Sequence, residues 1–104
     1  MNLNLVYITA EDTDEARAIG RALVESRLVA CVNIIDGVNS MYWWEGAIQD
    51  DHEAVLIAKT REALVPELIE KVKELHSYEC PCIVSMPIES GNVDFLRWIE
   101  DETK

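Results

Sequence analysis

Two short runs of strand-forming residues are apolar on both of their alternating faces. Residues 3–10 carry large apolar side chains at odd and even positions alike, and residues 29–35 form a β-branched run without a polar face. Successive side chains of a strand point to opposite sides of the sheet. A strand that is apolar on both sides is therefore expected to be covered on both sides.

Apolar residues recur at helical spacing in three other parts of the chain. Asp12 and Glu15 resemble a capping box, which predicts a first helix over about residues 13–27. A second amphipathic helix is expected to begin between residues 61 and 65, because Pro66 is tolerated only near a first turn, and to end near residue 76. A third, short helix is expected after Asn92 as its N-cap.

The middle of the chain is typical of a long hairpin. Residues 40–48 and 53–60 are both extended in character, and the polar pair Asp50–Asp51 between them predicts the turn. The dipeptide Asp36–Gly37 predicts an earlier turn at the end of the strand 29–35. A last strand over residues 83–88 is flanked by prolines, which favour a sheet edge.

The order of these elements predicts an α+β fold. Strand, helix, strand, strand pair, helix, strand and helix match the ferredoxin-like split β-α-β sandwich with an extended hairpin and an added C-terminal helix. A chain of 104 residues is too short for two separate cores, so we expect a single domain over residues 1–104. Two helices cover one face of such a sheet. The apolar second face therefore predicts an oligomer.

Charge and composition exclude several classes of function. Twenty acidic residues against nine basic ones give a net charge of −11, which repels nucleic acids and anionic membranes. No apolar run reaches the roughly 18 residues of a membrane span, and the first ten residues do not resemble a signal peptide. The four glycines are scattered, so no common nucleotide-binding loop is present. We expect a cytoplasmic protein.

Motifs along nearly the whole chain resemble the CutA divalent-cation tolerance family. The matching stretches are Ala30-Cys-Val-Asn-Ile34, Ser40-x-Tyr42-x-Trp44-Glu-Gly46, Glu53, Lys59-Thr60, His76-x-Tyr78-x-x-Pro81, and Gly91 leading to Leu96-x-Trp98-Ile99. The resemblance implies a PII-like homotrimer whose hairpins wrap neighbouring subunits, and a role in tolerance to copper and other divalent cations. Two departures stand out, because Ser77 replaces a usual proline and Phe95 a usual tyrosine. The first is expected to loosen the turn that holds His76.

Cys31 and His76 are the candidate metal ligands. A thiolate together with an imidazole suits copper or zinc better than magnesium or calcium, and the resemblance points to the same cysteine. Each residue has a structural alternative. Cys31 lies in an apolar strand, where a free cysteine serves as a small hydrophobe, and His76 could satisfy the last carbonyls of the preceding helix.

Glu53 and Lys59 are charged residues on an otherwise apolar strand face. They lie six residues apart, about 20 Å along a strand, so each needs a partner from elsewhere. Tyr78, His76 and Trp44 are the candidate partners, and we predict a ligand-binding cleft that includes Trp44, Glu53, Lys59 and Tyr78. Ion pairs that stabilise a subunit interface are the alternative. The acidic run over residues 50–53 alternates in direction and cannot converge on one ion.

Cys80 and Cys82 form a second candidate for soft metals. In an extended chain both thiols point to one side, with Cα atoms about 6.5 Å apart. The alternative is an incidental, oxidisable pair, because zinc would require further ligands.

Two functional hypotheses from different classes follow from the sequence. The first is a cytosolic homotrimer that binds divalent metal ions, copper foremost. The second is a PII-like signalling module with small effectors in its intersubunit clefts. No Ser-His-Asp arrangement or nucleophile elbow is present, and no residue is recognisable as the orienting partner of a Cys31/His76 pair, so no catalytic residues are predicted.

Overall fold

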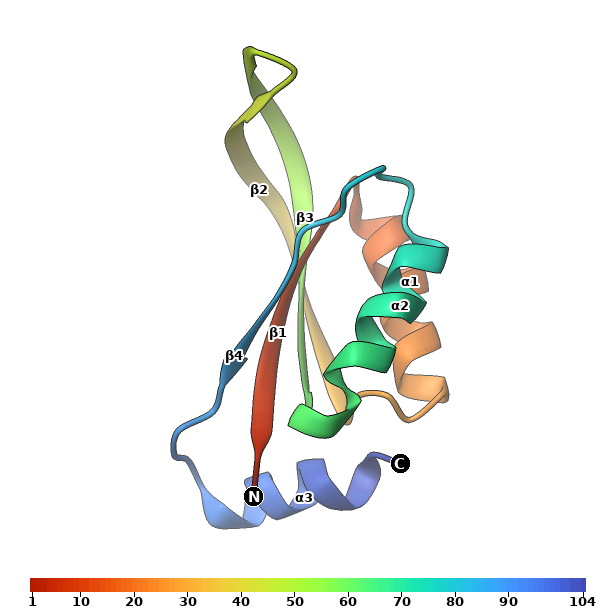
Figure 1. The fold of residues 1–104 in the computed structure, drawn as a ribbon, viewed down its shortest axis with the longest axis vertical. Helices are drawn as coiled ribbons and strands as arrows, with labels where there is room; N and C mark the ends of the chain where they lie inside the picture. The colour runs from red at the N-terminus through yellow and green to blue at the C-terminus, as the bar shows by residue number, and fades with distance from the viewer.

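Four antiparallel strands form one sheet, and two helices pack on one of its faces (Figure 1). The computed structural model describes residues 1–104. Its elements are β1 (Leu3–Ala10), α1 (Thr13–Glu25), β2 (Cys31–Trp44), β3 (Ala47–Arg61), a 3-10 turn (Glu62–Leu64), α2 (Val65–Leu75), β4 (Ile83–Pro87) and α3 (Val93–Glu102). The strand order is β2-β3-β1-β4. This confirms the predicted ferredoxin-like split β-α-β plan with an added C-terminal helix.

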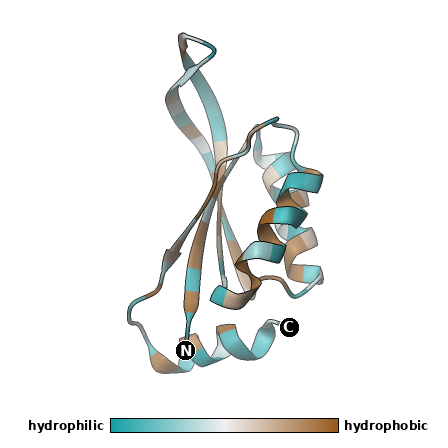
Figure 2. Cartoon of the chain, viewed as in Figure 1, coloured by the Kyte–Doolittle hydropathy of each residue, from teal (hydrophilic) through white to brown (hydrophobic).

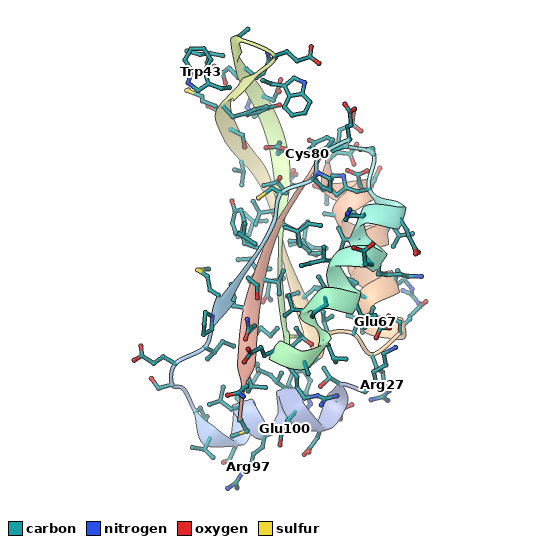
Figure 3. The ribbon with its side chains drawn as sticks, in the orientation of Figure 1. Arg27, Trp43, Glu67, Cys80, Arg97 and Glu100 are labelled. Atoms are coloured by element: carbon teal, nitrogen blue, oxygen red, sulfur yellow. The ribbon has the colours of Figure 1, made fainter.

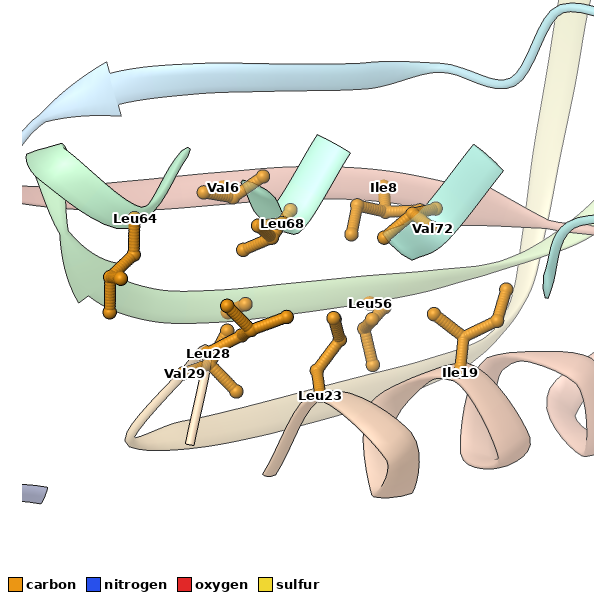
Figure 4. Close-up of a cluster of buried hydrophobic side chains, with 11 residues drawn as sticks. Val6, Ile8, Ile19, Leu23, Leu28, Val29, Leu56, Leu64, Leu68 and Val72 are labelled. Carbon is orange, nitrogen blue, oxygen red and sulfur yellow. The ribbon is translucent and has the colours of Figure 1, made fainter. Parts of the chain in front are cut away.

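The hydrophobic core lies between the sheet and helices α1 and α2 (Figure 4). Hydrophobic and hydrophilic residues alternate along these helices, so each has one apolar stripe that faces the strands (Figure 2). Eleven buried side chains form the main cluster: Val6, Ile8, Ile19, Leu23, Leu28, Val29, Leu56, Ala58, Leu64, Leu68 and Val72. No helix is long and apolar enough to cross a bilayer.

Helix boundaries agree with the sequence signals to within about two residues. The Asp12 side chain accepts a hydrogen bond from the Glu15 N–H and begins α1, as predicted. The helix ends at Glu25 rather than near 27, because Arg27 has a positive φ of 59° and leaves the helical conformation. Asn92 caps α3 by accepting from the Asp94 N–H.

The hairpin turn lies at Glu45–Gly46, and its predicted position at Asp50–Asp51 is wrong. Glu45 and Gly46 have φ values of 50° and 77°, the left-handed pair that a two-residue turn between twisted strands requires. Asp50 and Asp51 instead lie within β3, paired with Met41 and Ser40.

The predicted turn at Asp36–Gly37 is also wrong, because β2 runs through it as one strand. Ile35 pairs with Val55 and Val38 with Glu53, so β2 has one extra residue at this point. This is a β-bulge, and the positive φ of Gly37, 71°, accommodates it. Residues 29–35 and 40–48 therefore belong to one hairpin, whose end projects beyond the other strands (Figure 1).

The sheet face opposite the helices is only partly covered in the single chain. It carries Ile35, Val84 and Met86, which are each about half exposed, at 47%, 51% and 51%. The neighbouring Tyr7 and Ile57 are half-buried. We call this the open face.

Candidate functional site

A cavity of about 790 Å³ lies where the hairpin, β1 and the loop before β4 meet. The loop holding Cys80 runs beside the sheet below the projecting end of the hairpin (Figure 3). Three of the four predicted cleft residues, Trp44, Glu53 and Tyr78, lie in its wall. The complete lining is Tyr7, Thr9, Val38, Asn39, Ser40, Met41, Tyr42, Trp44, Glu53, Tyr78, Glu79, Cys80 and Cys82.

A buried carboxylate and a phenol form the centre of this wall. Glu53 is only 7% exposed, and the Tyr78 hydroxyl donates to its Oε2 at 2.7 Å. Burial, followed by this hydrogen bond, raises the pKa of Tyr78 far above its ordinary value. Tyr78 therefore stays a hydrogen-bond donor at neutral pH. The predicted partnership of Glu53 with Tyr78 is confirmed.

The acidic residues of β3 do not converge on one point. Asn39 Nδ2 donates to Asp50 Oδ1 at 2.7 Å, and the Tyr42 hydroxyl donates to Asp51 Oδ2 at 2.7 Å. The Asp51 hydrogen bond raises the pKa of Tyr42 above its usual range. No group of three or more His, Cys, Asp or Glu side chains gathers as a metal site in the chain.

His76 lies behind the cavity with no exposed side-chain surface. Its Nε2 donates to the Thr9 carbonyl at 2.7 Å, and its Nδ1 accepts from the Tyr78 N–H at 3.0 Å. The alternative prediction, that the His76 imidazole satisfies the last carbonyls of α2, is wrong, because the ring contacts Thr9 and Tyr78. Only the backbone N–H of His76 closes the helix, by donating to the Val72 carbonyl at 2.9 Å. Both ring nitrogens are engaged, so His76 fixes the position of Tyr78.

Glu15 connects α1 to the same loop. One carboxylate oxygen accepts from the Glu11 N–H at 3.0 Å and the other from the Ser77 N–H at 2.9 Å. Burial alone raises the pKa of Glu15, but these hydrogen bonds and the nearby His76 together hold it below its ordinary value. The Ser77 N–H, which a proline lacks, ties the loop to α1. The expected loosening of the turn stays a prediction.

Cys31 and Lys59 lie together at a different part of the sheet. They are directly paired residues of β2 and β3, and Lys59 Nζ lies 3.7 Å from Cys31 Sγ and 2.5 Å from Asn33 Oδ1. Lys59 is thus the one predicted cleft residue outside the cavity. Cys31 is also separated from His76. Cys31 pairs with Lys59, whereas Thr9, whose carbonyl accepts from His76, pairs with Val55. Lys59 and Val55 are four residues apart on β3, which is about 13 Å along the strand.

Several residues of the cavity were not predicted from the sequence. Tyr7 and Thr9 line it from β1, on the same face as Leu5, so the period of two was the available signal. Tyr42 belongs to one of the family-like motifs but was not predicted as a cavity residue. Cys80 and Cys82, which the sequence singles out as a pair, both contribute to the wall.

Comparison with known proteins places these features in a family. A family model described as CutA1 divalent ion tolerance protein matches residues 4–102. The divalent-cation tolerance protein CutA of Thermus thermophilus is 46% identical over 99 residues, which are 95% of this chain and 96% of that protein. Protein CutA 1, chloroplastic, of Oryza sativa is 40% identical over 96% of this chain. Since the match covers 56% of the rice protein, the chain spans about half of its length.

Solved structures agree in fold and in extent. The crystal structure of CutA1 from Oryza sativa has a TM-score of 0.97 at 38% identity, covering 100% of this chain and 95% of that one. The Thermus thermophilus structure, a divalent cation tolerance protein, has a TM-score of 0.96 at 44% identity and covers 98% and 99% of the two chains. This chain therefore belongs to the CutA1 divalent ion tolerance protein family.

Proposed function

We propose that the protein is a cytosolic homotrimer that binds divalent metal ions, copper foremost, and thereby contributes to metal tolerance. The observation that carries this proposal is membership of the divalent ion tolerance family across residues 4–102. The relatives are named for tolerance to divalent cations and not for an enzymatic reaction. The net charge of −11 supports the proposal, because it concentrates cations near the surface.

The open face supports assembly. Ile35, Val84 and Met86 would each lose their water contact if a second chain packed there, which stabilises association through apolar burial. Light scattering on dilute protein is expected to give about three times the chain mass of 11.8 kDa. A mass of one chain would contradict the trimer.

Cys31 and His76 remain our candidate ligands for the divalent ion. Because Cys31 lies on β2 and His76 is held against Thr9 on β1, two strands away and offset along the sheet, a shared ion requires ligands from two chains. His76 must also release one of its two hydrogen bonds. Lys59 beside Cys31 opposes a second cation there, so a Cys31 site requires that its ammonium group move away.

Calorimetric titration with Cu²⁺ and Zn²⁺ tests this assignment. We expect tight binding by the unchanged protein and its loss in Cys31→Ala and in His76→Gln. Circular dichroism of both variants separates lost binding from lost folding. Weak, salt-sensitive binding that neither substitution changes would leave only diffuse attraction to an acidic surface and would contradict the assignment.

An effector-binding function is the second candidate, and the cavity favours it. Its volume of about 790 Å³ lies in the range of small-molecule sites, and its wall combines aromatic rings with one buried carboxylate. Trp44 and Tyr78 would contact the ligand, and Glu53 would orient it. Lys59 could contribute only if another chain brought it close. A small-molecule screen by thermal shift tests this, with Glu53→Gln expected to abolish any stabilisation.

A cytosolic location agrees with the state of the cysteines. All three are free, and Cys80 and Cys82 are exposed. Exposed thiols persist in reducing compartments and oxidise elsewhere. Fluorescent tagging of the chain in its own cell tests the location directly.

A further inference from the structure

Cys80 and Cys82 lie in one wall of the cavity on a short, positioned segment. The backbone carbonyl of Cys82 accepts from the Thr9 N–H at 3.4 Å, which fixes the start of β4 against β1. Pro81 between them has a restricted φ and no N–H to donate. Both thiols are free and exposed, and both line the same cavity. The segment therefore presents two sulfur atoms to one space.

The alternation of β4 gives the direction of Cys82 independently. Ile83 packs against the core under the helices, whereas Val84 and Met86 are exposed on the open face. Cys82 is two residues before Val84 and lies on the same face. Cys80 lies two residues earlier, in the bend before β4, and lines the same cavity, so both cysteine side chains border the space in which one ion would sit.

The remaining groups of the cavity limit which ion fits. Its acidic members are Glu53, which already accepts from the Tyr78 hydroxyl, and Glu79. Zinc requires four ligands in a closed set, which two thiols and one free carboxylate do not supply. Monovalent copper and silver are soft and accept two thiolates in a linear arrangement. The donor set thus favours a soft monovalent ion over a hard or four-coordinate one.

We propose that Cys80 and Cys82 form a two-thiolate site for soft monovalent metal ions, Cu⁺ in particular. Binding replaces two S–H protons by one ion: two thiols and Cu⁺ give a bis-thiolate copper complex and two H⁺, with no change of oxidation state. The physiological purpose of this site rests on the proposed role in metal tolerance. It is separate from Cys31, which lies three strands away on β2.

Competition for Cu⁺ with a chromogenic chelator, under anaerobic conditions, tests this site on the full-length protein. The unchanged protein is expected to take up one Cu⁺ per chain from the chelator. Loss of an outer-shell partner already weakens metal binding by 10–100-fold, so Cys80→Ser and Cys82→Ser are each expected to weaken it by about 100-fold or more. The matched control is Met86→Leu, which removes another exposed sulfur on β4 outside the cavity and is expected to leave Cu⁺ affinity unchanged.

A second measurement identifies the ligands directly. With silver ion as a redox-inert probe, Cys80 and Cys82 are expected to be protected from alkylation, as read by mass spectrometry, while Cys31 is not. Unchanged Cu⁺ affinity in the Cys80→Ser/Cys82→Ser double variant would overturn the proposal, as would an equal loss in Met86→Leu. Both substitutions are at exposed positions, so circular dichroism should stay the same. Divalent-ion titration of the same double variant reports separately on the proposed function.

Discussion

The two faces of the sheet both carry large apolar side chains and differ in what covers them. On the helix-covered face, Val6, Ile8 and Leu56 have no exposed surface. On the open face, Ile35, Val84 and Met86 keep about half of theirs. The first set lies on the central strands β1 and β3 and the second on the outer strands β2 and β4, although every strand directs alternate residues to both faces. The difference between these sets therefore follows both from the helices that cover one face and from the central or outer place of each strand in the sheet.

This comparison separates the residues that fold the chain from those available for binding. Burial of the covered face happens within one chain and stabilises it without a partner. The open face gains the same stabilisation only when another molecule packs on it. The cavity lies at the end of the open face, where the sheet continues into the hairpin, so its residues belong to the second group.

Truncation on the covered face is expected to have the largest effect. Ile8→Ala leaves a cavity among packed side chains and should lower the free energy of unfolding by about 2–5 kcal/mol. Urea denaturation followed by circular dichroism measures the change. A loss below about 1 kcal/mol would show that the two faces do not differ as described.

The hydrogen bond inside the cavity is expected to have the next largest effect. Tyr78→Phe leaves the buried Glu53 carboxylate without its donor and should destabilise by about 1–3 kcal/mol. Because the pKa of Tyr78 is raised in the fold, the native protein loses part of this advantage above its ordinary value of 10.0. Thermal denaturation should show the stabilities of Tyr78→Phe and the unchanged protein converging as the pH rises above 10.0.

Replacing both partners provides the control for this pair. Glu53→Met combined with Tyr78→Phe removes the carboxylate together with its donor, so its stability should exceed that of Tyr78→Phe alone. A double variant less stable than both single ones would show that the two residues act independently.

The tie between α1 and the cavity loop is expected to depend on pH. The pKa of Glu15 is lowered in the fold, so its stabilisation is present above the ordinary value of 4.5 and is lost as pH falls through the folded value. Glu15→Gln should lower stability at pH 7 by about 1 kcal/mol, because its hydrogen bonds involve a charged acceptor. As the pH falls below 4.5, the stabilities of Glu15→Gln and the unchanged protein should converge. Equal differences at both pH values would contradict this account.

Truncation on the open face is expected to have the smallest effect in an isolated chain. Ile35→Ala removes a side chain that is already half exposed, so the unfolding free energy should fall by about 1 kcal/mol or less. In an assembly that covers this face the loss should be larger and should depend on protein concentration. Melting temperatures measured over a hundredfold dilution distinguish the two cases.

The helices and the strand order could be predicted from sequence, because apolar spacing and caps are local signals. Asp12 and Asn92 begin their helices as predicted. The turns were misplaced because Asp36–Gly37 and Asp50–Asp51 have the composition of turns while lying inside strands. Their positions depend on strand pairing, which a local pattern does not contain.

The candidate site was partly predictable for the same reason. Glu53 was predictable as a charge on an apolar face, and its need for a partner indicated Tyr78. Which distant residues come together in the fold was not predictable. Cys31 and His76 were therefore predicted as ligands of one ion, although they lie apart in the single chain. Tyr7 lines the cavity only because β1, the hairpin and the loop before β4 meet there in the fold.

The extra residue at Gly37 determines which side chains of the projecting end lie on each face of the hairpin. Before the bulge the odd-numbered residues of β2 share a face with Glu53, Val55 and Ile57, and after it the even-numbered ones do. This shift of parity directs Tyr42 and Trp44 into the cavity and leaves Trp43 outside. Deletion of that single residue would shift the pairing of every later β2 residue by one position. It would exchange the inner and outer faces of the projecting end while leaving every other residue of the chain the same.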